Sequence, residues 1–139
     1  MEFKYIQVVW LTLVGGLAAY AVVAYLLLTL GDVGMGAVPL DVMPYIAAGA
    51  IAMMLGGLGL KRRLLSAIPN SVQAEKRLEQ YFAATTVGLA LVEGAGLILI
   101  TLSIVADAPT WTLVGGGAAI GTLIIGRPRR EEAGLRPGR

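Results

Sequence analysis

The chain has 139 residues, of which 57% are hydrophobic and only 14% charged, and 11 basic and 9 acidic residues leave a net charge of +2. An ordinary soluble domain carries about 25% charged residues, so this composition indicates a protein whose solvent is lipid. The chain has no cysteine and no histidine, which excludes disulfides, thiolate and imidazole metal ligands, and catalysis by either side chain.

The first apolar run extends over about residues 5–30. A membrane-spanning helix needs about 20 apolar residues, so this run is long enough to cross a bilayer. A cleaved signal peptide is the competing interpretation, but its apolar region would be only about 7–15 residues long. We therefore expect a retained transmembrane helix.

The second apolar run, residues 42–60, follows Asp41, which could serve as its N-cap. Glycine lets the backbones of neighbouring membrane helices approach closely, so the glycines of this run are expected in helix packing. Simple tolerance of glycine in a membrane helix is the alternative. The four glycines are Gly49, Gly56, Gly57 and Gly59.

A basic triplet that begins at Lys61 ends the second run, and a polar connection follows it. Asn70 and Gln73 resemble a capping box, which predicts that the third helix covers residues 71–105.

The fourth helix is predicted over residues 110–126, after a tight turn at residues 106–109. It contains Gly117 and Gly121 in a Gly-x-x-x-Gly pattern, so we expect these two glycines in helix packing as well. The polar tail that follows, residues 127–139, is expected to be disordered.

The basic residues indicate how the helices cross the membrane. All 11 lie at the N-terminus, in the connection between the second and third helices, or in the tail. The only charged residues in the other two loops are acidic: Asp32, Asp41 and Asp107. Cytoplasmic loops are enriched in Lys and Arg, so both termini should be cytoplasmic. The predicted fold is an all-α, four-helix transmembrane bundle over residues 1–126, integral to a bacterial or archaeal plasma membrane.

Glu93 is the only ionisable residue inside a long apolar run. A charged carboxylate at mid-membrane depth costs roughly 2.5–3.5 kcal/mol, and no Lys or Arg lies at that depth to pair with it. Thr86, Ala90 and Gly94 form a small-residue stripe beside Glu93, along which a neighbouring helix could shield the carboxyl. Glu93 is therefore a candidate ion-binding residue that carries a proton; the alternative is a structural hydrogen bond between helices.

The segment from Gly88 to Leu97, GLALVEGAGL, resembles the carboxylate helix of the c subunit, or proteolipid, of rotary ATP synthases. In that family a glycine, a small residue and an apolar pair precede the ion-carrying acid in the same order. The resemblance extends over about residues 43–105. It implies that Glu93 occupies the ion-carrying position and, since Gly94 and Ala95 follow it in place of polar ligands, that the ion is a proton.

The remaining residues suggest no catalytic, cofactor or metal site, and no nucleic-acid partner, so we do not expect an enzyme. The glycine-rich faces predict a homo-oligomer or a subunit of a larger membrane complex. Two functions follow: a proteolipid-like subunit that transports protons on Glu93, or a non-catalytic accessory or scaffolding subunit of a respiratory or photosynthetic complex with a structural glutamate. A small-molecule transporter is weaker, because one acid offers little substrate chemistry.

Overall fold

The computed structural model of the chain describes residues 2–31, 36 and 38–134, and every regular element in these ranges is a helix. The helices are α1 (Phe3–Leu30), α2 (Met43–Ser66), α3 (Ala74–Val105) and α4 (Pro109–Ile125). The all-α class and the four predicted helices are confirmed. Asp32, one of the predicted loop acids, lies outside the described residues.

Two helix boundaries differ from the sequence prediction by more than two residues. Helix α2 continues through the basic triplet to Ser66, because Lys and Arg end an apolar run but are good helix formers. Helix α3 begins at Ala74, since residues 69–72 form a turn in which the amide of Val72 donates to the carbonyl of Pro69.

The predicted caps are also wrong. The N-cap residues of α2 and α3 are Val42 and Gln73, in place of Asp41 and Asn70, and neither forms a side-chain capping hydrogen bond. The carbonyl of Asn70 instead accepts a hydrogen bond of 2.7 Å from the guanidinium of Arg77.

Helices α1, α2 and α3 are each long and apolar enough to cross a membrane. Helix α4 is apolar but has only 17 residues, a length of about 25 Å against a hydrocarbon core of about 30 Å. Apolar side chains such as Leu11, Tyr45, Leu55 and Ile125 are more than half exposed on the outside of the bundle. Three spanning helices with an apolar exterior indicate an integral membrane protein.

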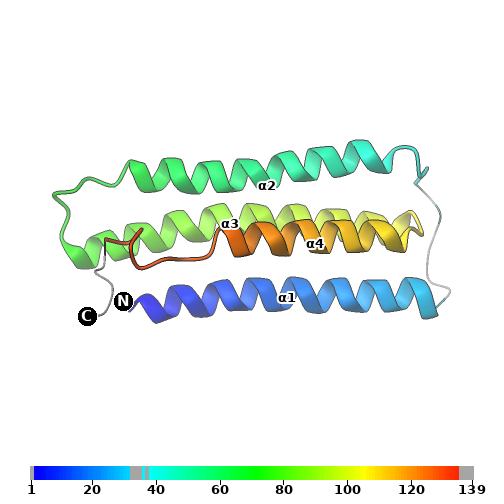
Figure 1. Cartoon of the computed structure of the whole chain (residues 1–139), viewed down its shortest axis with the longest axis horizontal. Coiled ribbons are helices and arrows are strands. Elements are labelled where there is room, and N and C mark those ends of the chain that lie inside the picture. The colour runs from blue at the N-terminus through cyan, green and yellow to red at the C-terminus, as the bar shows by residue number, and fades with distance from the viewer. Residues whose placement is uncertain (1, 32–35, 37, 135–139) are drawn as a thin grey trace.

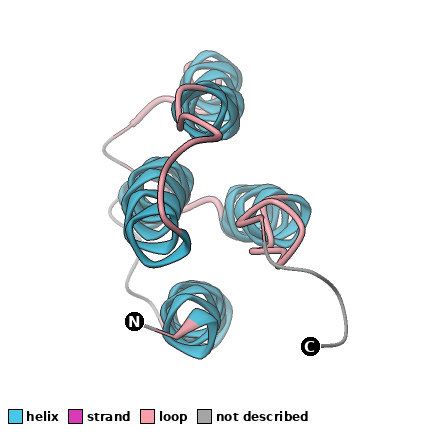
Figure 2. Ribbon diagram, turned by 90° about the vertical axis from the view of Figure 1, so that its left-hand side faces the viewer, coloured by secondary structure: helices cyan, strands magenta, loops and turns pink. Residues whose placement is uncertain are grey.

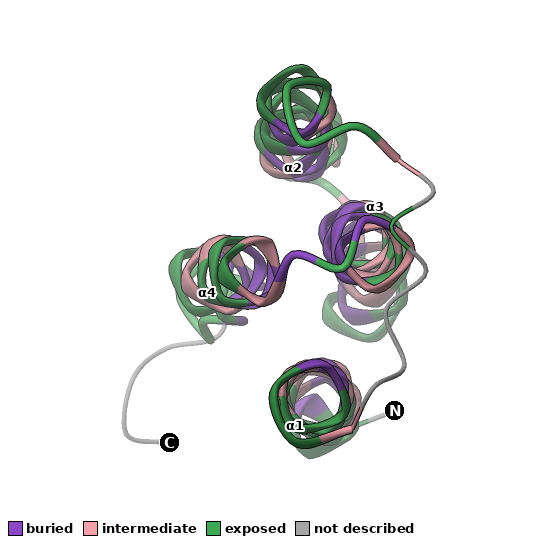
Figure 3. Ribbon diagram, turned by 90° about the vertical axis from the view of Figure 1, so that its right-hand side faces the viewer, coloured by how far each residue is buried: buried purple, intermediate pink, exposed green. Residues whose placement is uncertain are grey.

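The helices lie side by side along one axis (Figure 1). The start of α1, the α2–α3 connection and the segment after α4 lie at the same end of the bundle, which we call the terminal end; the turn between α3 and α4 lies at the opposite end (Figure 1). Viewed along the axis, α3 and α4 lie between α1 and α2, whose buried sides face inward (Figure 3). Both outer helices contact α3 and α4, but over the described residues they do not contact each other.

Helices α2 and α3 approach each other closely at two glycines. A Cβ atom placed on Gly57 would lie 2.7 Å from the carbonyl oxygen of Gly88, and one placed on Gly88 would lie 2.6 Å from the Cβ atom of Lys61. No side chain fits at either position without moving a backbone. These two glycines therefore set the distance between α2 and α3.

Candidate functional site

Glu93 lies in the C-terminal half of α3, among apolar residues. Two helical turns further along α3, the hydroxyl of Thr101 forms a 2.7 Å hydrogen bond with the hydroxyl of Tyr20 from α1, but Thr101 lies about 80° around the helix from Glu93. The Glu93 side chain is partly exposed. Over the described part of the chain, its carboxyl forms neither a hydrogen bond nor an ion pair with another residue.

The small residues predicted to shield Glu93 are only partly covered by neighbouring helices. Ala90 is exposed, and the nearest atom to a Cβ placed on Gly94 is the flexible end of Met53, at 3.8 Å. The hydroxyl of Thr86 is buried without a hydrogen-bond partner. Residues four apart rotate by about 40° per step around a helix, so Thr86, Ala90 and Gly94 do not all face one neighbour.

Of the six glycines predicted to pack between helices, only Gly57 lies at a close crossing. Nothing lies within 4 Å of a Cβ atom placed on any of the others, which are Gly49, Gly56, Gly59, Gly117 and Gly121. The tight crossings use Gly88 against α2, Gly96 against Ala119, and Gly115 against Leu99. The sequence prediction missed Gly88 and Gly96 because glycine occurs on several faces of the helices and only the packing shows which face is inside.

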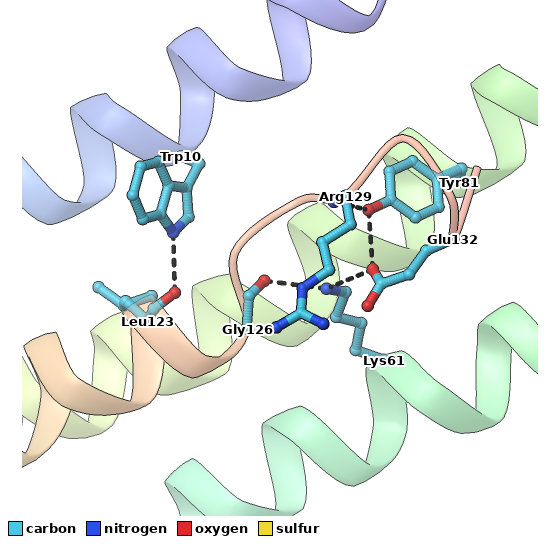
Figure 4. A network of polar contacts seen from close by, with 7 residues as sticks. All are labelled: Trp10, Lys61, Tyr81, Leu123, Gly126, Arg129 and Glu132. Carbon is cyan, nitrogen blue, oxygen red and sulfur yellow. Dashed lines mark hydrogen bonds and ion pairs between the residues drawn. The ribbon is translucent and has the colours of Figure 1, made fainter. Parts of the chain in front are cut away.

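A polar network that the sequence analysis did not predict lies at the terminal end (Figure 4). Lys61 of α2 is only 4% exposed, and its Nζ donates to the carbonyl of Gly126 at 2.9 Å and to Oε2 of Glu132 at 3.2 Å. The hydroxyl of Tyr81, on α3, donates to the same carboxylate oxygen at 2.9 Å. That hydroxyl also accepts a 3.0 Å hydrogen bond from the backbone amide of Arg129.

The network and Trp10 provide hydrogen-bond donors for carbonyl groups at the C-terminal end of α4. The last carbonyls of a helix have no partner within it and carry the negative end of the helix dipole. The indole of Trp10 donates to the carbonyl of Leu123 at 2.8 Å, and the ammonium group of Lys61 takes the carbonyl of Gly126 (Figure 4). A lysine can be buried here because its charge meets both a carboxylate and a helix C-terminus.

The prediction of a disordered tail is wrong for residues 127–134, which we call the C-terminal cap. The cap folds over the terminal end, as Figure 2 shows from that side. Ala133 is buried in a cluster with Phe3, Ile6, Leu78 and Tyr81. A Cβ atom placed on Gly134, whose φ is +74°, would lie 2.7 Å from a guanidinium nitrogen of Arg77. Residues 135–139 lie outside the described residues.

The sequence analysis does not pair Lys61 with Glu132. The available signals were weak: a pair of acids within a basic tail, and a basic triplet that directly continues a helical run. Neither pattern identifies which residues meet. In comparisons with protein-family models, curated proteins and solved structures, nothing matches this chain.

Proposed function

We propose that this protein is a small polytopic membrane subunit that carries a proton on Glu93, in the manner of a proteolipid. The observation that supports this function is a single, partly exposed carboxyl within α3, with no hydrogen-bond or ion-pair partner among the described residues. A glutamate that only joined helices of this chain would be expected to hydrogen-bond across one of them. A partly exposed carboxyl can instead hold a proton in lipid and release it on meeting water or a basic group of a partner.

Uncovered glycines on the surface of the bundle support assembly with other chains. Gly49, Gly56 and Gly59 on α2, and Gly117 and Gly121 on α4, leave open space where a side chain would stand. Smooth surfaces of this kind let a helix of another protein approach closely. They also favour the second candidate, an accessory or scaffolding subunit in which Glu93 bonds to a partner protein.

We propose further that the chain crosses the membrane four times and that the terminal end is cytoplasmic, where Lys and Arg are enriched. A reporter domain inserted at Gly36 should then be extracytoplasmic, and one fused near Arg136 should be cytoplasmic. Protease protection in sealed vesicles measures both positions. The reverse pattern, or an odd number of crossings, would contradict this topology.

The proton-carrying role is tested with a hydrophobic carbodiimide, which attacks protonated carboxyls that are accessible from lipid. We expect one labelled residue, Glu93, with labelling that decreases as the pH is raised. Glu93→Gln should abolish labelling and any proton flux in reconstituted vesicles while the protein still folds, because glutamine keeps the size of the side chain but cannot titrate. Labelling is measured by mass spectrometry and flux with a pH-sensitive dye.

Glu79→Gln is the matched control, since Glu79 is exposed near the start of the same helix. This variant should label like the unchanged chain. If the unchanged chain is not labelled and Glu93→Gln is fully functional, the proton-carrying role is excluded and the accessory role remains.

A further inference from the structure

Two cavities lie one after the other along the axis of the bundle, in the seam between α1 and the chain from α4 to Pro128. We call the cavity nearer the terminal end the lower cavity and the other the upper cavity. The upper cavity, of about 310 Å³, is apolar and lies between α1 and α4; its lining includes Ala18, Val22, Gly116 and Gly117. The lower cavity, of about 220 Å³, lies toward the terminal end and is lined by Gln7, Trp10, Leu11, Arg127 and Pro128. No acidic residue lines either cavity.

One face of α1 lines both cavities. Gln7, Leu11, Ala18, Val22 and Tyr25 follow the helical repeat and therefore lie along one side of the helix. From Leu11 to Val22 this face extends about 16 Å, close to half the thickness of a hydrocarbon core. The lower cavity and the nearer part of the upper cavity thus span about the depth of one lipid leaflet, and the upper cavity continues beyond it to Leu26.

At the depth between the two cavities, two glycine positions are not crowded by other side chains. Gly15 on α1 and Gly121 on α4 are at the intermediate depth, and nothing lies within 4 Å of a Cβ atom placed on either of them. A flexible apolar chain could follow this surface from the lower cavity to the upper one.

The lining of the lower cavity includes a cationic group. The guanidinium of Arg127 lies over the indole ring of Trp10, with its central carbon 5.7 Å from the ring centroid. The indole is held in place by its own hydrogen bond to the carbonyl of Leu123. Arg127 is exposed and forms no ion pair with a described residue. A guanidinium stacked on an aromatic ring keeps its in-plane N–H donors free for a phosphate.

We propose that this seam binds one anionic phospholipid from the leaflet at the terminal end, with the phosphate at Arg127 and an acyl chain along the groove toward Gly117. The aromatic ring and the basic residue, at the depth of the headgroups, match the phosphate group of such a lipid. The apolar groove beside them matches its acyl chain. A second copy of this chain fits less well. Symmetric pairing through this face would bring the basic segment Arg127–Arg130 of each copy toward that of the other.

The test uses the full chain, purified in mild detergent and incubated with phosphatidylglycerol or with phosphatidylcholine of the same acyl chains. Native mass spectrometry should find one retained lipid per chain and a preference of about five-fold for phosphatidylglycerol. Arg127→Gln should remove the preference. Arg63→Gln removes the same charge from an exposed site on α2, outside both cavities, and should keep it.

A second pair of variants tests the groove. Gly117→Leu places a side chain in the upper cavity and should lower retention of both lipids, whereas Gly49→Leu, at an equally open position on α2, should not. The proposal is overturned if both lipids bind equally, if Arg63→Gln has the same effect as Arg127→Gln, or if Gly117→Leu retains lipid normally. It is also overturned if the particle contains a second chain in place of the lipid and Gly117→Leu removes that chain.

Discussion

Gly88→Ala should destabilise the protein by about 1–3 kcal/mol, although alanine is the better helix former. The added Cβ would lie 2.6 Å from the Cβ of Lys61, 2.8 Å from the carbonyl oxygen of Gly57 and 3.3 Å from the Cα of Lys61. Two of these three atoms belong to the backbone and the third is fixed to it, so α2 and α3 must separate. Reversible unfolding in mixed detergent, followed by circular dichroism, measures the change.

Gly59→Ala is the matched control on α2. It makes the same chemical change where nothing lies within 4 Å of the added Cβ, so it should be neutral or stabilising by up to about 1 kcal/mol. Equal stability of the Gly88→Ala and Gly59→Ala variants would mean that the α2–α3 crossing is not as close as described here.

Lys61→Met is expected to release the C-terminal cap and to cost about 2 kcal/mol of stability. Methionine keeps the length and the apolar stem of the side chain but leaves the carboxylate of Glu132 and the carbonyl of Gly126 without their cationic partner. Removing one partner of a fully buried ion pair costs about 3–5 kcal/mol, but the Glu132 side chain is 36% exposed, so water replaces part of the loss. Limited digestion with trypsin should cut the variant faster after Arg129 and Arg130, because the released cap can enter the protease.

Arg63→Met is the control for the loss of a basic residue from the same helix. Arg63 is exposed, so this variant should keep the stability and the trypsin resistance of the unchanged chain. A Lys61→Met variant that resists trypsin equally would show that the apolar cluster around Ala133, and not the lysine, holds the cap.

The sequence was sufficient to identify the helices. Each helix is a long apolar run, and the turn before Pro109 was also recognisable in the sequence. In the structure Asp107 of that turn adopts a φ of 53°. The basic residues also predicted which connections share one end of the bundle. Run length, composition and charge act locally along the chain, so they can be read without knowing which helices are neighbours.

The position of Glu93 was predictable only in part. Its depth in the third helix follows from counting residues, and the helix is where the sequence places it. Its exposure was not predictable, because Thr86, Ala90 and Gly94 would shield it only if a helix lay over that stripe. In the bundle, α2 instead crosses α3 at Gly88, on another face.

Tertiary structure alone decided which small and charged residues meet. Glycine is equally compatible with a packed face and a lipid-facing one, so only the arrangement of α2, α3 and α4 separates Gly57 and Gly88 from Gly49 or Gly117. Lys61 follows the apolar run like any flanking charge, yet it is buried because the last turn of α4 and Glu132, 71 residues away in the sequence, converge on it. The energy of a carbonyl or carboxylate in a low-dielectric site depends on which groups surround it in space. No single segment of the chain contains all of these groups, so the sequence of that segment cannot show whether the carbonyl or carboxylate has a partner.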